Sequence, residues 1–207
     1  MFMGLGMPIP DLSNKPGPGR PGWGPIGSYD FQFRVEGTEA VVIKANAAGA
    51  GNFRISWPNG TTQLLSGDNA SITAPDATDG IVSINNEKLD TTYCDEFAVI
   101  GGKSVVREVI SWGQNPWSNM GQAFANCDNL TSISETVFTA GTNCYMASML
   151  DNCDSLTVAK INNWNLSAGI DAYEGLIRNC DNLEELDATG LIVKFSSASG
   201  GRTMFGN

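Results

Sequence analysis

The stretch Ala123-Phe-Ala-Asn-Cys-Asp-Asn-Leu130 has two near copies later in the chain, Met149-Leu-Asp-Asn-Cys-Asp-Ser-Leu156 and Leu176-Ile-Arg-Asn-Cys-Asp-Asn-Leu183. The shared core is Asn-Cys-Asp-(Asn/Ser)-Leu, and the cysteines of successive copies are 26 and 27 residues apart. A fourth copy begins at Met204-Phe-Gly-Asn207. Repeats of this period are typical of a solenoid, in which each unit stacks on the next. The second half of the chain is therefore predicted to be repetitive in three dimensions.

Each repeat is predicted to hold a short helix, a turn and a strand. The helix would carry the apolar pair before the motif, within residues 117–124 and 145–150, and Asn and Asp around the Cys fit a helix end and a turn. One unit cannot bury its apolar face alone, so stacked units should share one core. We expect this repeat core to contain Phe124, Cys127, Leu130, Leu150, Cys153, Leu156, Ile177, Cys180 and Leu183.

The five cysteines predict buried thiols. Their number is odd, they form no CxxC pair and the chain has no His, which argues against a zinc site and against a dense disulfide framework. A free Cys packs as a small apolar side chain, so Cys127, Cys153 and Cys180 should form an internal ladder. Functional thiols at these stacked positions are the less favoured alternative.

Residues 30–100 alternate between apolar and polar side chains, as in strands with one buried face. In the first run, Phe31, Phe33 and Val35 share a face. Asn59-Gly60 is the typical hairpin pair between two such runs. Short strands at this spacing predict an antiparallel β-sandwich. The runs cover residues 29–35, 40–44, 53–57, 61–65, 71–73 and 80–84.

Residues 1–29 differ from the rest in being rich in Pro and Gly. Six of the nine prolines lie here together with seven glycines, a composition that excludes a helix or a central strand. One interpretation is a disordered terminus, and the other is an extended arm that becomes ordered on a partner. Large apolar side chains favour the arm, because a pure spacer does not need them. The predicted partner-binding residues are Phe2, Leu5, Met7, Ile9 and Trp23.

Net charge and residue content exclude several functions. The net charge of the 207 residues is −10, and acids outnumber bases 10 to 4 in residues 30–100 and 11 to 6 in residues 101–207. Such a body disfavours nucleic acid and anionic membrane surfaces, and no run reaches the roughly 18 apolar residues of a membrane helix. Without His, Ser-His-Asp and Cys-His catalysis are impossible within the chain, and there is no phosphate-binding P-loop. We therefore expect no enzyme activity and no cofactor.

Three other patterns have a structural and a functional interpretation. The carboxylate pairs Asp95-Glu96 and Glu184-Glu185 are interpreted as solvated surface charge rather than as a glycosidase site. Asp151-Asn-Cys-Asp154 fits a repeat turn, with calcium binding as the alternative. The tryptophans are interpreted as core or junction residues rather than sugar platforms, with Trp112 and Trp117 near the first repeat.

Residues 104–207 resemble the BspA-type leucine-rich repeats of bacterial and viral surface proteins, through Val109-Ile-Ser-Trp112-Gly113, Trp117-Ser-Asn-Met120 and the Asn-Cys-Asp motifs. Residues 29–100 resemble a PKD-like β-sandwich, with Ile55-Ser-Trp57-Pro58-Asn59-Gly60-Thr61 at its characteristic hairpin. The start of the chain resembles virion proteins of marine tailed bacteriophages, especially cyanophages. The resemblance implies a mixed α+β fold, an antiparallel β-sandwich followed by a short leucine-rich-repeat-like solenoid. It also implies a virion structural protein on the virion surface.

The sequence thus predicts an extended N-terminal anchoring arm (1–29), a PKD-like β-sandwich (30–100) and BspA-type repeats (101–207), with a boundary where Gly101-Gly102 interrupts the chain. Two functions follow. One is a capsid decoration or tail-attached protein that contacts other virion proteins through its arm. The other is an adhesin that binds a host-surface glycan or protein. Capsid or tail location, copy number and oligomeric state are left open.

Overall fold

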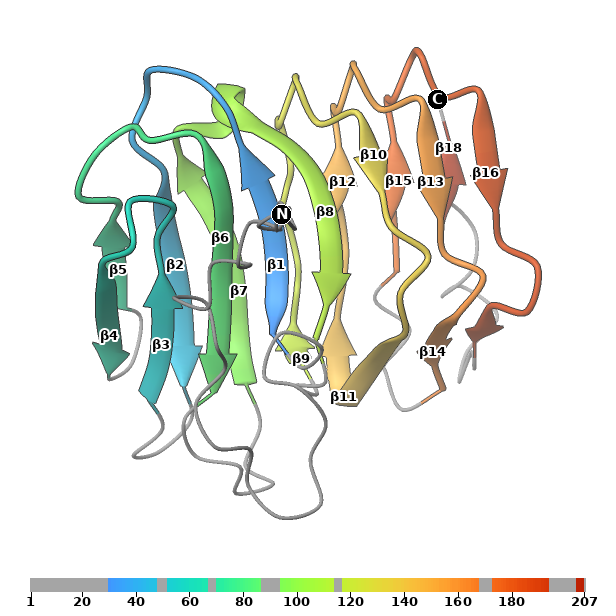
Figure 1. The fold of residues 1–207 in the computed structure, drawn as a ribbon. Helices are drawn as coiled ribbons and strands as arrows, with labels where there is room; N and C mark the ends of the chain where they lie inside the picture. The colour runs from blue at the N-terminus through green and yellow to red at the C-terminus, as the bar shows by residue number, and fades with distance from the viewer. Residues whose placement is uncertain are drawn as a thin grey trace, which may run out of the picture.

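The computed structural model describes residues 30–47, 52–66, 70–86, 94–113, 117–167, 173–193 and 204–206. Within these residues the protein has eighteen strands, one 3-10 helix, η3 (Lys103–Val105), and no α-helix. The strands form an eight-stranded, a seven-stranded and a three-stranded sheet (Figure 1). The expectation of a β-rich fold is confirmed, whereas the expected helical share of an α+β fold is absent from the described residues.

The first seven strands form two antiparallel groups that face one core. One group is β1-β6-β3-β4 and the other is β7-β2-β5. Along β1 the side chains alternate, with Phe31, Phe33 and Val35 buried, because successive residues of a strand point to opposite faces. The bounds are β1 (Phe31–Val35), β2 (Val42–Ala47), β3 (Asn52–Ser56), β4 (Thr62–Ser66), β5 (Ala70–Thr73), β6 (Gly80–Asn86) and β7 (Cys94–Gly101).

The hairpin expected at Asn59-Gly60 joins β3 to β4, with a loop one residue longer than the expected pair. The Trp57 N–H donates to the Thr61 carbonyl over 2.9 Å, and the Gly60 N–H donates to the Trp57 carbonyl over 3.0 Å. Of Pro58, Asn59 and Gly60, only Gly60 has a positive φ, at 82°. Three-residue hairpins of this kind place Gly in the left-handed position.

After η3, strands β8 (Val106–Trp112) and β9 (Trp117–Asn119) lead into three coils, each of which adds one strand to each of the three sheets. Strands in successive coils pair in parallel, so the repeats form a β-solenoid (Figure 1). The first coil holds β10 (Ser132–Ile133), β11 (Phe138–Tyr145) and β12 (Leu150–Asp151); the second holds β13 (Val158–Lys160), β14 (Trp164–Leu166) and β15 (Ile177–Arg178); the third holds β16 (Glu185–Asp187), β17 (Ile192–Val193) and β18 (Phe205–Gly206).

The prediction of a short helix in each repeat, and with it a leucine-rich-repeat solenoid, is wrong. Residues 121–126 are turns, and Gln122 and Asn126 adopt left-handed conformations with φ of 59° and 61°. Two left-handed residues four apart prevent a right-handed helix from forming. Backbone groups bond instead to the next coil, as where the Phe124 N–H donates to the Met149 carbonyl over 2.9 Å. The apolar pairs that suggested a helix face therefore lie in a turn at Phe124 and in two-residue strands at Leu150 and Ile177.

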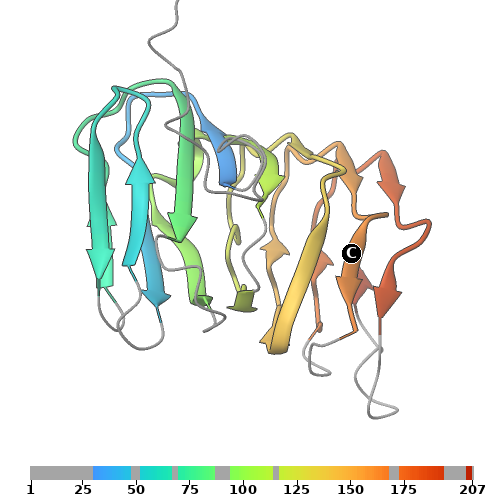
Figure 2. The ribbon, with the colours of Figure 1, turned by 60° about the horizontal axis from the view of Figure 1, so that its bottom comes forward.

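The two larger sheets continue from the sandwich into the solenoid. The eight-stranded sheet runs β16-β13-β10-β8-β1-β6-β3-β4, and β8 pairs antiparallel with β1 on one side and parallel with β10 on the other. Strands of residues 30–101 and strands of the coils lie on opposite sides of the β1–β8 contact and do not interleave (Figure 2). The boundary near residue 101 remains a prediction, and the β-sheet hydrogen bonding passes across it.

Trp112 and Trp117 lie where the sandwich meets the coils. Both are fully buried. The Trp112 ring stacks on Phe31 of the sandwich with centroids 5.7 Å apart and meets Trp164 of the second coil edge-on at 5.0 Å. Trp117 stacks on Phe53 at 5.7 Å. These side chains join both parts into one core, and as buried rings they cannot serve as sugar platforms.

Candidate functional site

The Asn of each Asn-Cys-Asp motif forms a sharp corner of its coil. Asn126, Asn152 and Asn179 have φ of 61°, 55° and 51°, a left-handed conformation that Asn tolerates better than most side chains. The first two side chains are joined, since Asn152 Nδ2 donates to Asn126 Oδ1 over 3.1 Å, whereas Asn179 Nδ2 donates to Asp151 over 2.9 Å. The Asn152 N–H also donates to the carbonyl of Arg178 in the next coil over 3.0 Å. The motif is therefore a structural corner.

The Cys of each motif points into the core. Cys127, Cys153 and Cys180 are buried free thiols, and Cys144 is a fourth. The Cys153 thiol donates to the Phe124 carbonyl over 3.3 Å, and the Cys180 thiol donates to the Leu150 carbonyl over 3.1 Å. Each of these two thiols thus reaches back one coil. Burial raises the pKa of Cys127 to about 12, so its reactive thiolate is scarce near neutral pH.

The other repeat-core residues predicted from the sequence line the same interior. Leu183, on the third coil, is only partly buried and packs against the edge of the core. The others, Phe124, Leu130, Leu150, Leu156 and Ile177, are buried. The predicted partner-binding residues Phe2, Leu5, Met7, Ile9 and Trp23 lie outside the described residues.

Polar side chains beside each corner connect successive coils. Asn129 Nδ2 donates to the Ser104 carbonyl and Asn182 Nδ2 donates to the Asp154 carbonyl, both over 2.7 Å. Thr157 Oγ1 donates to the Thr131 carbonyl over 3.2 Å. The Thr positions were not selected from the sequence, although Thr after the motif Leu in two repeats was a usable signal.

The oxygens of Asp151, at the end of the first coil, are already engaged by the second coil. Arg178 forms an ion pair with this carboxylate, and Asn179 Nδ2 donates to it over 2.9 Å. The Arg178 hydrogen bond holds the pKa of Asp151 below its usual value. In the described part of the chain, no cluster of three or more Cys, Asp or Glu side chains is placed to hold a metal ion. The geometry favours the repeat-turn interpretation of Asp151 over calcium binding.

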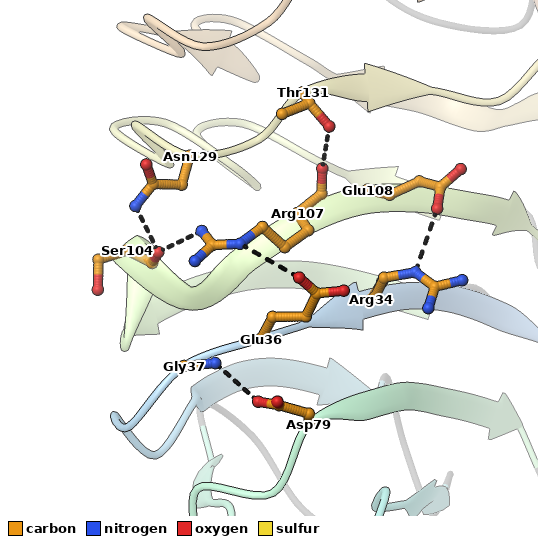
Figure 3. Close-up of polar contacts among 9 residues, drawn as sticks. All are labelled: Arg34, Glu36, Gly37, Asp79, Ser104, Arg107, Glu108, Asn129 and Thr131. Carbon is orange, nitrogen blue, oxygen red and sulfur yellow. Dashed lines mark hydrogen bonds and ion pairs between the residues drawn. The ribbon is translucent and has the colours of Figure 1, made fainter.

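A polar network covers the junction between sandwich and solenoid (Figure 3). Arg107 of β8 lies 3.9 Å from Glu36 and donates to the Ser104 carbonyl over 2.7 Å. Asn129 donates to the same carbonyl, and Thr131 Oγ1 donates to the Arg107 carbonyl over 3.0 Å. Exposed ion pairs contribute little, about 0–1 kcal/mol. The network fixes the position of the first coil more than it stabilises the fold.

A shallow hollow lies over one end of the sandwich. Its apolar wall includes Trp57, Pro58 and Val82, and its rim includes Asp76. Hydrogen bonds from Thr78 and Asn59 lower the pKa of Asp76, so this carboxylate stays ionised and is already bonded. Two more carboxylates line the hollow: Glu39 accepts a hydrogen bond from Ser104 Oγ over 2.7 Å, and Glu36 lies 3.9 Å from Arg107.

The cysteine ladder predicts different costs for two Cys→Ser variants. Cys153→Ser should lower the free energy of unfolding by about 1 kcal/mol, because the Phe124 carbonyl can still accept a hydrogen bond from the new hydroxyl. Cys127→Ser should cost about 2–3 kcal/mol, since among the described residues the Cys127 thiol donates no hydrogen bond, unlike those of Cys153 and Cys180. Urea unfolding measures both values. Equal costs would contradict the assigned hydrogen bonds.

Comparisons with known proteins identify no relative of this chain. No family model, no curated protein and no solved structure matches this chain. In the portion of the chain placed by the structure, no helix has the length and apolar character needed to cross a membrane. Function must therefore be argued from the repeats, the core and the surface of this chain.

Proposed function

We propose that the chain is a non-enzymatic structural protein of a virion surface, a capsid decoration or tail-attached protein that its N-terminal arm holds on the particle. The main support is the single core that joins sandwich and coils. Hydrogen-bonded sheets and buried aromatic rings continue through Trp112, so the described body should move as one piece. A body of this kind suits display and contact better than substrate turnover.

The sandwich also covers one end of the solenoid. A terminal repeat exposes the face that would otherwise pack on a neighbour, so solenoids need a cap. Here β8 and β9 carry the sandwich sheets into the first coil. The sandwich thus serves as the cap at one end of the solenoid, which leaves residues 1–29 available as the attachment to other virion proteins.

Deletion of residues 1–26 tests the anchor. The shortened protein should remain soluble and folded, because the first described strand begins at Phe31, but it should no longer join the particle. A control chain in which residues 1–26 are replaced by a Gly/Ser segment of equal length keeps the length and loses the apolar side chains. Quantitative mass spectrometry of purified particles measures incorporation. If the deleted chain is incorporated as well as the full chain, the sandwich or the coils make the attachment instead.

A second candidate function is adhesion to a host-surface glycan or protein. It is favoured by the exposed aspartates Asp128, Asp154 and Asp181, which follow the corners of successive coils and form a regular polar row. Copy number separates the two functions, because a decoration protein is abundant on a particle and a fibre-tip adhesin is scarce. The same mass spectrometry experiment, calibrated against the major capsid protein, gives that number.

A further inference from the structure

Strand β4 ends the eight-stranded sheet on the side away from the coils (Figure 2). Within the described residues it pairs only with β3, in an uninterrupted antiparallel register. The Leu65 side chain faces the core and is 4% exposed, whereas Leu64 points outward and is 55% exposed. In this part of the chain, one strand edge and a large apolar side chain beside it are therefore left without a partner.

The backbone groups at this edge belong to alternate residues of β4. At the hairpin the Trp57 N–H donates to the Thr61 carbonyl, so these two residues form a hydrogen-bonded pair. Bonded and non-bonded pairs alternate along antiparallel strands, and every second residue after Thr61 therefore turns its N–H and C=O toward β3. The N–H and C=O groups of Thr62, Leu64 and Ser66, which lie between them, point to the open edge.

Strand β4 lacks the features that usually protect an edge strand from pairing with another chain. Its sequence, Thr62-Gln-Leu-Leu-Ser66, contains no charged residue and no Pro, and its pairing with β3 has no bulge. The sandwich edge of the seven-stranded sheet differs, because the exposed side chains described on β5 are the polar Ser71 and Thr73. A further strand should therefore add at β4 rather than at β5.

The charge around β4 permits a second copy of the same acidic chain to approach. Acids outnumber bases 10 to 4 in residues 30–100, yet β3, β4 and β6 contain no Asp or Glu, and Arg54 of β3 is their only charged residue. If two β4 strands paired, the two Arg54 positions would be three strand steps apart, about 14 Å. This separation exceeds the Debye length of about 8 Å at physiological ionic strength, so their repulsion is largely screened.

The pattern of β4 is complementary to itself. We propose that a second copy of the chain pairs antiparallel along β4, about a two-fold axis at Leu64. In this register the Leu64 N–H of each copy donates to the Leu64 carbonyl of the other, and Thr62 of each copy exchanges both hydrogen bonds with Ser66 of the other. Every backbone group that β4 leaves open is then bonded. The two Leu64 side chains lie opposite each other on the outer face, where each covers the other.

The dimer joins the eight-stranded sheets of two copies into one continuous sheet. It concerns the chain free in solution and does not depend on the proposed function. Because one short strand from each copy makes the contact, the interface is small and the dimer should be weak, forming at about 0.1–1 mM protein. The contact is isologous and uses the only edge of β4, so association should stop at two copies rather than continue into a fibre.

Sedimentation velocity of the full chain and of two lysine variants tests the proposal. Leu64→Lys places like charges across the two-fold axis and should raise the dimer dissociation constant about tenfold or more. The matched control is Ile81→Lys, which adds the same charge to the outer face of β6, two strands from the edge, at a side chain that is 42% exposed. This control should dimerise as the natural chain does.

Hydrogen exchange locates the contact within the strand. In the natural chain the Leu64 amide should exchange about tenfold more slowly at about 1 mM than at about 10 µM protein, because the second copy protects it. The neighbouring Leu65 amide faces β3 within the same molecule. It should stay protected at both concentrations and in both variants, which reports that the sandwich is folded.

Each other result would overturn the proposal. A natural chain that stays monomeric up to about 1 mM means that no second copy binds at β4. A dimer that survives Leu64→Lys, or one in which exchange of the Leu64 amide does not depend on concentration, means that the copies meet at another surface. Equal weakening by both lysine variants means that added charge on the outer face, rather than pairing at the edge, controls association.

Discussion

Trp112→Ala should lower the free energy of unfolding by about 3–5 kcal/mol, the usual cost of emptying a large buried aromatic site. The ring is fully buried and contacts Phe31 of the sandwich together with Phe138 and Trp164 of the coils. Its removal leaves a cavity between the two parts of the body that the β-sheet hydrogen bonds on either side cannot close. Because both parts share this core, they should still unfold together.

Urea titration followed by far-ultraviolet circular dichroism measures this change. Val137→Ala is the matched control, since Val137 is 61% exposed and its truncation should change the unfolding free energy by about 0.5 kcal/mol or less. The contradicting result is a variant that unfolds in two separate steps, one for the sandwich and one for the coils, with the stability of the sandwich unaffected by the substitution. That outcome would show that sandwich and solenoid are independent folding units.

Alkaline pH should destabilise the protein through its buried thiols. Burial raises the pKa of Cys127 and of Cys144 to about 12, from an ordinary value of 9.0. Between these values the unfolded chain releases the thiol proton while the folded chain retains it. Stability is therefore unaffected below pH 9 and falls above it, by about 1.4 kcal/mol per pH unit for each thiol.

Comparison with Cys127→Ala isolates this effect from other groups that titrate at high pH. The variant should be less stable than the natural chain at pH 8, and the difference should shrink by about 1 kcal/mol between pH 9 and pH 10, because the unfolded thiol is only half ionised at pH 9. Urea unfolding at each pH gives the values. A difference that stays constant over this range would mean that the Cys127 thiol ionises as easily in the folded state as in the unfolded state.

Local patterns in the sequence predicted six of the seven sandwich strands and the existence of the repeat, but not β7. Alternation of apolar and polar residues, as in Phe31-Gln-Phe33-Arg-Val35, has only one simple reading, because a strand turns every second side chain to the same face. The 26- and 27-residue spacing of Cys127, Cys153 and Cys180 likewise requires equivalent positions in successive units. These signals are local or periodic, so no knowledge of distant contacts was needed to read them.

The conformation inside each repeat and the way the two parts join depend on contacts between residues far apart in the sequence. Apolar pairs such as Phe124 and the residue before it fit one face of a helix or the inside of a coil equally well. Hydrogen bonds from Phe124 to Met149 and from Asn126 to Asp151, between residues about 25 apart, favour the coil. The β1–β8 pairing also depends on which strands become neighbours. Such pairings are set by the combined burial of many distant side chains, which a local pattern does not record.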